Sequence, residues 1–134
     1  PDRSDEVAYG KYLADVGRCR YCHTPNDAPG RERKGMAFTG GARYWVGGRY
    51  LPGARVIDTP NLTTHPAGLG NLSRDGFIAL FKARGSGLKV SLATNTVMPW
   101  VAFSNMTDKD LGAIWAYLQT VPPQPTSKPL DYEF

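Results

Sequence analysis

The pentapeptide Cys19-Arg20-Tyr21-Cys22-His23 constrains the fold more than any other stretch of this chain. Its C-x-x-C-H spacing is the attachment signature of c-type haem. Two thiols at this spacing reach the two vinyl groups on one edge of a porphyrin and form thioethers. The histidine that follows then lies under the iron and can ligate it. The pentapeptide therefore predicts one covalent haem c held by Cys19, Cys22 and His23.

Two other interpretations of the cysteine pair fit the sequence less well. A thioredoxin-like C-x-x-C dithiol belongs to a strand-turn-helix setting within a β-α-β pattern, which this sequence lacks. A zinc site needs further Cys or His ligands at paired spacings, but the whole chain contains 2 cysteines and 2 histidines. We therefore expect both cysteines to serve a single haem attachment.

Three stretches with helical spacing of apolar residues predict a mainly α-helical protein. They cover residues 5–17, residues 73–85 and a last segment that opens at Thr107 and ends at Pro122. Acidic residues at the start of the first helix suit the helix dipole. Ser73 fits the N-cap of the second helix and Gly85 its C-terminal stop. Thr107 and Asp110 form a variant of the capping box at the start of the third.

The segments between these helices, 24–71 and 86–106, are expected to be long ordered loops, because the chain contains 15 glycines and 11 prolines. One small β-hairpin is predicted where aromatic runs at 43–46 and 49–51 flank the glycine pair 47–48. It is either a plain surface hairpin or a flap over one haem edge. A flap would contact the haem propionates, and arginine suits such contacts with carboxylates. The candidate contacts are Arg43, Trp45, Arg49 and Tyr50.

The second axial ligand of the iron must come from a small set: Met36, His65, Met98, Met106 or none. Met36 follows His23 too closely to cross to the opposite haem face. Met106 directly precedes the cap of the last helix and suits packing, and the loop residue His65 has no supporting motif. Met98 lies far downstream in a loop, and Pro99 restricts it to extended backbone. We therefore predict Met98 as the sixth ligand.

Length and charge limit the class of protein further. The 134 residues favour one domain, and there is no run of about eighteen apolar residues that could span a membrane. The polar start without a signal peptide predicts a mature protein or an excised domain. The net charge of +4 would be offset by about half by two haem propionates, and the remainder favours acidic partners. The sequence has no dense basic stripe or recognition helix, which disfavours nucleic acid.

Together these segments resemble class I c-type cytochromes: the helix that ends in the pentapeptide, the Met98-Pro99 loop and the final helix over 110–118. More closely, three segments are similar to the cytochrome c subunits of bacterial membrane-bound alcohol and polyol dehydrogenases. These are residues 10–14, residues 59–63, and Met98-Pro99-Trp100 followed by residues 107–111.

The resemblance implies a class I cytochrome c fold, in which three or more short helices and long loops wrap round a covalent haem. It implies that the first and last helices cross, with Gly10 allowing close approach near Ile114 and Tyr117. It also implies axial ligation by His23 and Met98, and we expect Trp100 at the cofactor beside Met98. Residues 1–123 would form the monohaem domain, and the proline-rich residues 124–134 a C-terminal strap or linker remnant.

The resulting hypothesis is a one-electron carrier and not an enzyme, because two strong protein ligands leave the iron no open position. Its partners would be a dehydrogenase, a reductase or a terminal oxidase. The resemblance implies a periplasmic or membrane-facing location. One alternative is an electron-entry module of a larger fused redox enzyme. Another is a haem gas sensor or enzyme with a displaceable sixth ligand.

Overall fold

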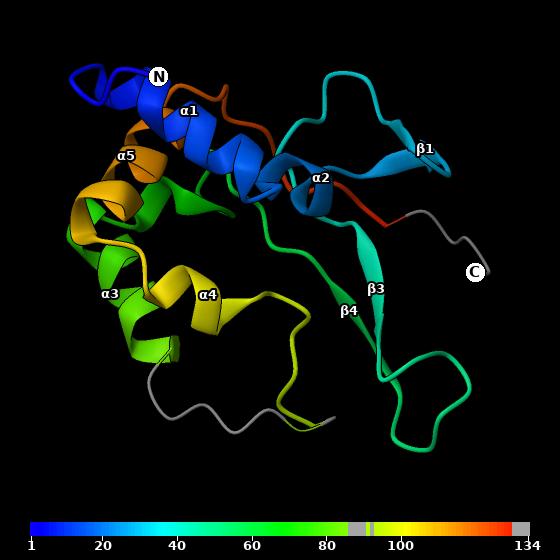
Figure 1. Cartoon of the computed structure of the whole chain (residues 1–134). Coiled ribbons are helices and arrows are strands. Elements are labelled where there is room, and N and C mark those ends of the chain that lie inside the picture. The colour runs from blue at the N-terminus through cyan, green and yellow to red at the C-terminus, as the bar shows by residue number, and fades with distance from the viewer. Residues whose placement is uncertain (86–90, 92, 130–134) are drawn as a thin grey trace.

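The computed structural model describes residues 1–85, 91 and 93–129 of the chain. Four of its helices lie on one side of the molecule and a β-hairpin lies on the other (Figure 1). The α-helices are α1 (Glu6–Val16), α2 (Cys19–His23), α3 (Arg74–Gly85), α4 (Trp100–Ser104) and α5 (Asp108–Leu118). The strands are β1 (Asn26–Ala28), β2 (Arg31–Glu32), β3 (Arg43–Val46) and β4 (Arg55–Asp58), and a short 3-10 helix, η1, spans Leu69–Asn71. The haem-motif helix α2 lies between the helical side and the hairpin.

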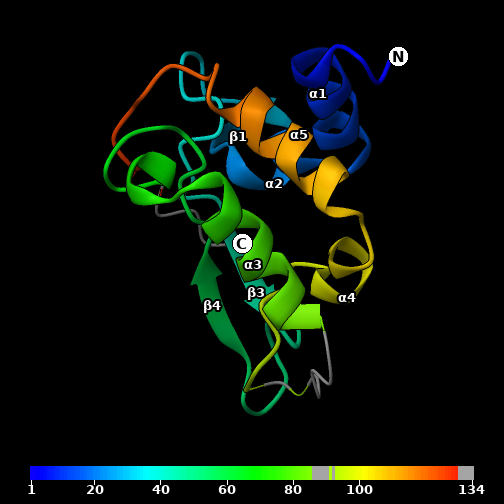
Figure 2. The same ribbon diagram turned by 90° about the vertical axis from the view of Figure 1, so that its left-hand side faces the viewer.

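Helix α1 begins one residue after the predicted start, and α5 begins at its predicted capping box. The Asp5 side chain accepts a hydrogen bond from the Ala8 backbone N–H at 3.0 Å. The predicted capping box is confirmed, since Thr107 caps Asp110 and the Asp110 carboxylate accepts from the Thr107 N–H. The two helices cross and pack against each other above α3 (Figure 2). The Tyr9 hydroxyl ties the crossing by donating to Asp110 Oδ1 at 2.8 Å.

Gly10 lies where α1 and α5 approach most closely. A Cβ atom at this position would lie 1.8 Å from the carbonyl oxygen of Ala113 and 3.1 Å from the backbone nitrogen of Ile114. The predicted close approach near Ile114 is therefore confirmed, and the contact is between backbones. No side chain larger than hydrogen fits here without moving one helix.

We expect Gly10→Ala to lower the free energy of unfolding by about 3 kcal/mol, because the added methyl group would force the two backbones apart. Denaturant unfolding followed by far-UV circular dichroism measures the change. The control is Lys11→Ala, next in the same helix, where an exposed ion pair with Asp15 is lost and the midpoint should hardly move. Equal midpoints for Gly10→Ala and the parent would contradict the tight crossing.

The apolar core connects these helices to the haem motif. Its buried members come from α1, α2, α3, α5, the 3-10 helix η1 and one loop: Ala14, Cys19, Phe38, Leu69, Phe77, Phe81, Leu111, Ile114 and Leu118. Phe77 and Phe81 lie on one face of α3, with ring centroids 4.9 Å apart, and Phe81 also packs on Trp100. Burial of this cluster supplies the main drive for folding. It also surrounds Cys19 with apolar side chains.

The predicted hairpin exists, but its second strand is not the one predicted. β3 pairs antiparallel with β4 at 55–58, whereas the aromatic run 49–51 lies in the connecting loop. Gly47, Gly48 and Gly53 all adopt positive φ, which is incompatible with a continuous strand. Residues 47–54 therefore form turns with local backbone hydrogen bonds and do not pair with β3. A second small hairpin, β1–β2, turns at residues 29–30 within a stretch predicted to be loop.

The segment 86–106 was also predicted to be loop, but it contains the short helix α4. Pro99 precedes this helix without a capping side chain, so no local signal marks its start. Gly87 lies outside the described residues, as do the final Leu130 to Phe134. Within the described parts of the chain, no helix combines the length and apolarity needed to cross a bilayer.

Candidate haem site

A left-handed residue separates α1 from the haem-motif helix. Arg18 has φ of +57°, an uncommon conformation for a side chain other than glycine. It redirects the chain after Gly17 so that α2 starts at Cys19, and Cys22 donates its backbone N–H to the Arg18 carbonyl at 3.3 Å. Cys19 and Cys22 lie three positions apart within α2, so both sulfurs project from one side of a single helical turn.

The environment of Cys19 suits a thioether better than a thiolate. Its side chain is buried in the apolar core, and this burial raises the pKa of Cys19 to about 11. The thiol therefore stays neutral at pH 7, unlike the low-pKa cysteine of a redox dithiol. A thioether is neutral and apolar, so burying it costs little free energy. The surroundings of Cys19 therefore fit a covalently attached cofactor.

His23 is held in the form that an axial ligand requires. Its ring is buried, and burial lowers the pKa of His23, which favours the neutral imidazole. The Nδ1 atom lies 2.8 Å from the carbonyl oxygen of Pro60. A carbonyl can only accept, so Nδ1 carries the hydrogen and the lone pair lies on Nε2. Together with the cysteine pair, this donor set fits a haem iron.

Tyr44 is a further residue at this site. It lies on β3, with its hydroxyl beside the Cys22 side chain. Burial first and the Cys22 side chain second raise the pKa of Tyr44. Sequence reasoning chose Arg43 and Trp45 on the same strand and missed Tyr44. The alternation of the strand could have identified it, because Tyr44 and buried Val46 share one face.

The Met98 loop packs on the same apolar core that contains Cys19. Met98 is half-buried, and the residue before it, Val97, has φ of +66°. Positive φ in a β-branched residue is strained and persists only where its surroundings enforce it. Arg55 of β4 supplies part of that enforcement by donating to the backbone carbonyls of Ala93, at 3.2 Å, and Asn95. Sequence reasoning also missed this arginine.

The other residues that the sequence analysis considered as haem contacts or as the sixth ligand differ in their surroundings. Trp100 packs on Phe81 and donates to Thr96 Oγ1 at 2.8 Å, which holds it beside the Met98 loop. Met106 also contacts the core, from the junction of α4 and α5, whereas Met36 is outside it. His65 is half-buried, and its Nδ1 accepts from the Ala67 N–H.

The four predicted propionate contacts lie along the hairpin. Arg43 forms an ion pair with Asp58, its cross-strand partner, at 2.9 Å. Trp45 lies on the more exposed face of β3. Arg49 and Tyr50 lie in the loop beyond it, where the guanidinium stacks 5.8 Å from a tyrosine ring that is 89% exposed.

Comparison with known proteins identifies relatives among cytochrome subunits. The alcohol dehydrogenase (quinone) cytochrome c subunit of Gluconacetobacter polyoxogenes is 34% identical over 96% of this chain and 27% of its own length. The fructose dehydrogenase cytochrome subunit of Gluconobacter japonicus is 28% identical over 85% of this chain and 21% of its own. A dihaem cytochrome c-type protein of Cereibacter sphaeroides is 32% identical over 90% of this chain and 37% of its own length. The chain thus spans between 21% and 37% of the length of these relatives.

These relatives confirm the predicted resemblance to dehydrogenase cytochrome subunits. The family model described as cytochrome c matches residues 7–122 and confirms the predicted cytochrome c fold. The match begins in α1 and ends after α5, so it includes the whole of the site described above. The protein therefore belongs to the cytochrome c family, whose members bind haem c covalently and carry electrons.

Proposed function

We propose that this protein carries single electrons on one haem c that is bound to Cys19 and Cys22 and ligated by His23 and Met98. The observation that carries the proposal is the buried His23 imidazole, whose Nδ1 donates to Pro60 and leaves Nε2 available. When bound, the haem supplies the redox centre, with iron that alternates between ferrous and ferric states. The chain supplies ligands and a pocket of low dielectric.

Each of the two proposed ligands, His23 and Met98, is positioned by two structural features. On the proximal side, α2 holds His23 while the Pro60 carbonyl fixes its ring orientation and raises its basicity. On the distal side, Arg55 and the Trp100–Thr96 hydrogen bond hold the loop that carries Met98. Such preorganised ligands would resist displacement, and ligation by Met and His would raise the reduction potential of the bound haem. This arrangement favours a carrier over the gas sensor considered above.

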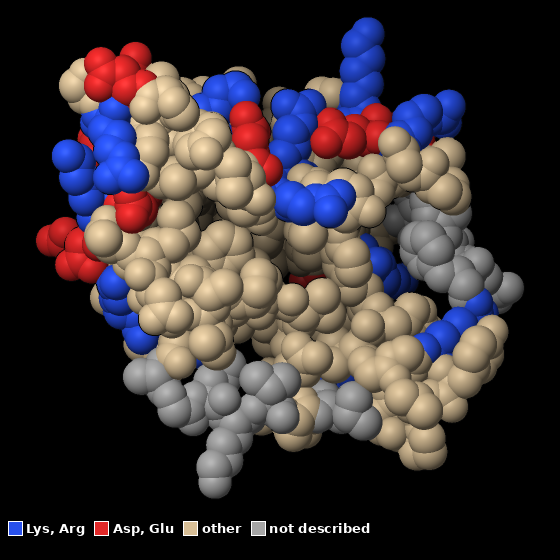
Figure 3. All heavy atoms as spheres, in the orientation of Figure 1, with Lys and Arg blue, Asp and Glu red and all other residues tan. Residues whose placement is uncertain are grey.

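The proposal extends to organisation and partners. Residues 1–123 would form the haem domain with residues 124–134 appended, and the hairpin residues Arg43, Trp45, Arg49 and Tyr50 remain the candidate propionate contacts. The relatives are cytochrome subunits of dehydrogenases, which favours a dehydrogenase as electron donor, either as a separate protein or as a fused module. Membership of the cytochrome c family favours a periplasmic location. Charged side chains gather at the upper edge of the face in Figure 3, and its centre is largely uncharged. The net charge of +4 favours a partner that is acidic at its docking face.

Spectroscopy of the intact oxidised protein tests the proposal. We expect a near-infrared absorption band from the bond between ferric iron and the Met98 sulfur, and a redox titration that fits one electron per chain. Carbon monoxide should bind the reduced protein slowly or not at all. A five-coordinate ferrous spectrum with rapid carbon monoxide binding would favour the sensor. Absence of attached haem in the mature protein would reject the whole proposal.

A further inference from the structure

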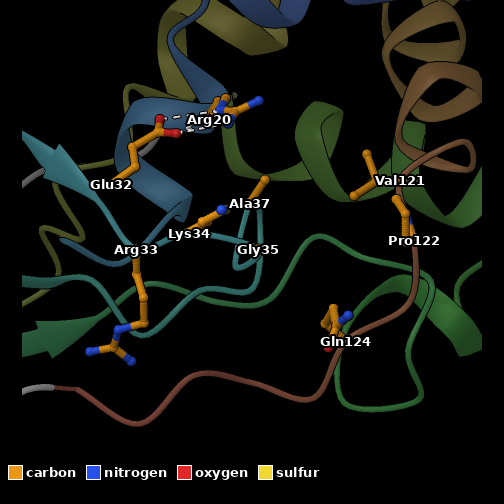
Figure 4. Close-up of a pocket in the computed structure, with 9 residues that line it drawn as sticks. All are labelled: Arg20, Glu32, Arg33, Lys34, Gly35, Ala37, Val121, Pro122 and Gln124. Atoms are coloured by element: carbon orange, nitrogen blue, oxygen red, sulfur yellow. Dashed lines mark hydrogen bonds and ion pairs between the residues drawn. The ribbon is translucent and has the colours of Figure 1, made fainter. Parts of the chain in front are cut away.

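The chain does not leave the molecule after α5. Residues 124–128, here called the proximal strap, follow the end of the family match at residue 122 and run back across two loops. Gln124 of the strap lies across a groove of about 490 Å³ from Arg20 of α2 (Figure 4). The anchors of the strap are the loops that hold Thr39 and Asn61.

The first anchor joins Gln124 to the loop after Pro60. The Asn61 Nδ2 atom donates to the backbone carbonyl of Gln124 at 2.8 Å, and the Gln124 N–H donates to Thr63 Oγ1 at 3.3 Å. Asn61 and Thr63 are almost completely buried. The Asn61 Oδ1 atom also accepts from the Thr63 N–H at 2.8 Å. One asparagine thus connects the strap to the residues that follow Pro60.

The second anchor joins Ser127 to the loop before Gly40. The buried Ser127 donates its N–H to the Thr39 carbonyl at 3.3 Å, and its hydroxyl accepts from Arg33 Nη1 at 2.6 Å. Arg33 reaches this position because its side chain points away from the groove and toward the strap (Figure 4). Asp27 holds the same guanidinium from the other side at 3.1 Å.

Two glycines, Gly40 and Gly41, lie between the strap and the Pro60 loop and contact both through backbone atoms alone. A Cβ atom on Gly41 would lie 2.1 Å from the Ser127 carbonyl oxygen, and one on Gly40 would lie 2.5 Å from the Pro60 carbonyl carbon. The Gly40 N–H donates to the His23 carbonyl at 2.8 Å. The strap, the glycine loop, the Pro60 loop and His23 are therefore stacked backbone against backbone. Close-packed interiors transmit such displacements.

We propose that the proximal strap is a positioning element that holds the Pro60 carbonyl against His23 Nδ1 and thereby tunes the reduction potential. The proposal rests on the proposed function, in which His23 ligates the iron. A hydrogen bond from Nδ1 makes an imidazole a stronger electron donor, and that stabilises the ferric state. Releasing the strap lets the Pro60 carbonyl retreat, so the hydrogen bond weakens and the potential rises.

The test uses Ser127→Pro in the full chain, because proline removes both the N–H that reaches Thr39 and the hydroxyl that accepts from Arg33. We expect a higher reduction potential and faster solvent exchange of the His23 Nδ1 hydrogen in NMR spectra, with the near-infrared band retained. Ser127→Ala removes the hydroxyl contacts with Arg33 and the Lys128 carbonyl but keeps the N–H that reaches Thr39, so it should give a smaller shift in the same direction. Pro125→Ala, at an exposed position of the strap, is the matched control and should leave both measurements unchanged.

Three results would overturn the inference. Parental values of both the potential and the exchange rate in Ser127→Pro would make the strap a packing element only. A shift of equal size in Pro125→Ala would show that the effect is not specific to the anchors. A parent protein without a His23-ligated haem would reject the proposed function, and the inference with it. If Ser127→Pro does not fold, Ser127→Ala decides the question by the same two measurements.

Discussion

Cys19→Ala combined with Cys22→Ala is expected to eliminate attached haem, because the two sulfurs are the chain's only means of forming thioethers to the porphyrin. Acid-acetone extraction should leave the colour with the parent protein and none with the double variant. The yield of folded protein should also fall steeply, since buried Cys19 belongs to the core that would surround the cofactor. A haem stain after denaturing electrophoresis measures the covalent fraction directly.

Tyr21→Phe provides the matched control, because Tyr21 lies between the two cysteines in α2 but is 57% exposed. This variant should attach haem as the parent does. Single variants separate the two sulfurs, and each should retain one thioether with reduced yield. Colour that moves into the solvent from the parent protein would show that the cofactor is not covalent.

Met98→Ala is expected to change both the coordination and the potential of the iron. Loss of the thioether opens the sixth position to water or a small ligand, so the ferric protein should become partly high-spin and lose its near-infrared band. The reduction potential should fall by on the order of 0.1 V, within the roughly 0.8 V range that axial ligands control. Visible and near-infrared spectra with potentiometric titration measure these changes.

Met98→His and two distant methionine variants sharpen this result. Met98→His should keep the iron six-coordinate and low-spin but lower its potential, because imidazole favours ferric iron more than a thioether does. Met36→Leu and Met106→Leu should leave the spectrum almost unchanged. If either of these leucine variants removes the band while Met98→Ala retains it, the ligand assignment is wrong, and so is the role given to the loop.

Local signals in the sequence predicted the parts of the fold that local interactions determine. The acidic start at Asp5 and the capping box at Thr107 marked the starts of α1 and α5 to within one residue. The backbone fit at Gly10 was also predicted, although through family resemblance and not through periodicity. The short helix α4 was missed because neither a cap nor a long apolar pattern marks residues 100–104.

Contacts between distant segments could not be predicted in the same way. Pro60 holds His23 through a backbone carbonyl, which any residue would offer, so its identity carries no signal for the contact. Arg55 reaches the Met98 loop only because β4 begins at that residue and not in the aromatic run before it. The error in the strand position therefore concealed one support of the candidate site.

The hydrogen bond between Tyr9 and Asp110 also limits the pH range in which the helix crossing is complete. Hydrogen bonds from Thr107 first, and then from Tyr9, lower the pKa of Asp110 below its ordinary 3.8. The stability contributed by the ionised Asp110 is therefore fully present above pH 3.8 and is lost in stronger acid. The same bond raises the pKa of Tyr9 above its ordinary 10.0, so the phenol keeps its proton until more alkaline pH. The stability that this hydrogen bond gives to the α1–α5 crossing is therefore constant over a broad pH range. It is lost in acid when Asp110 gains a proton and in alkali when Tyr9 loses one.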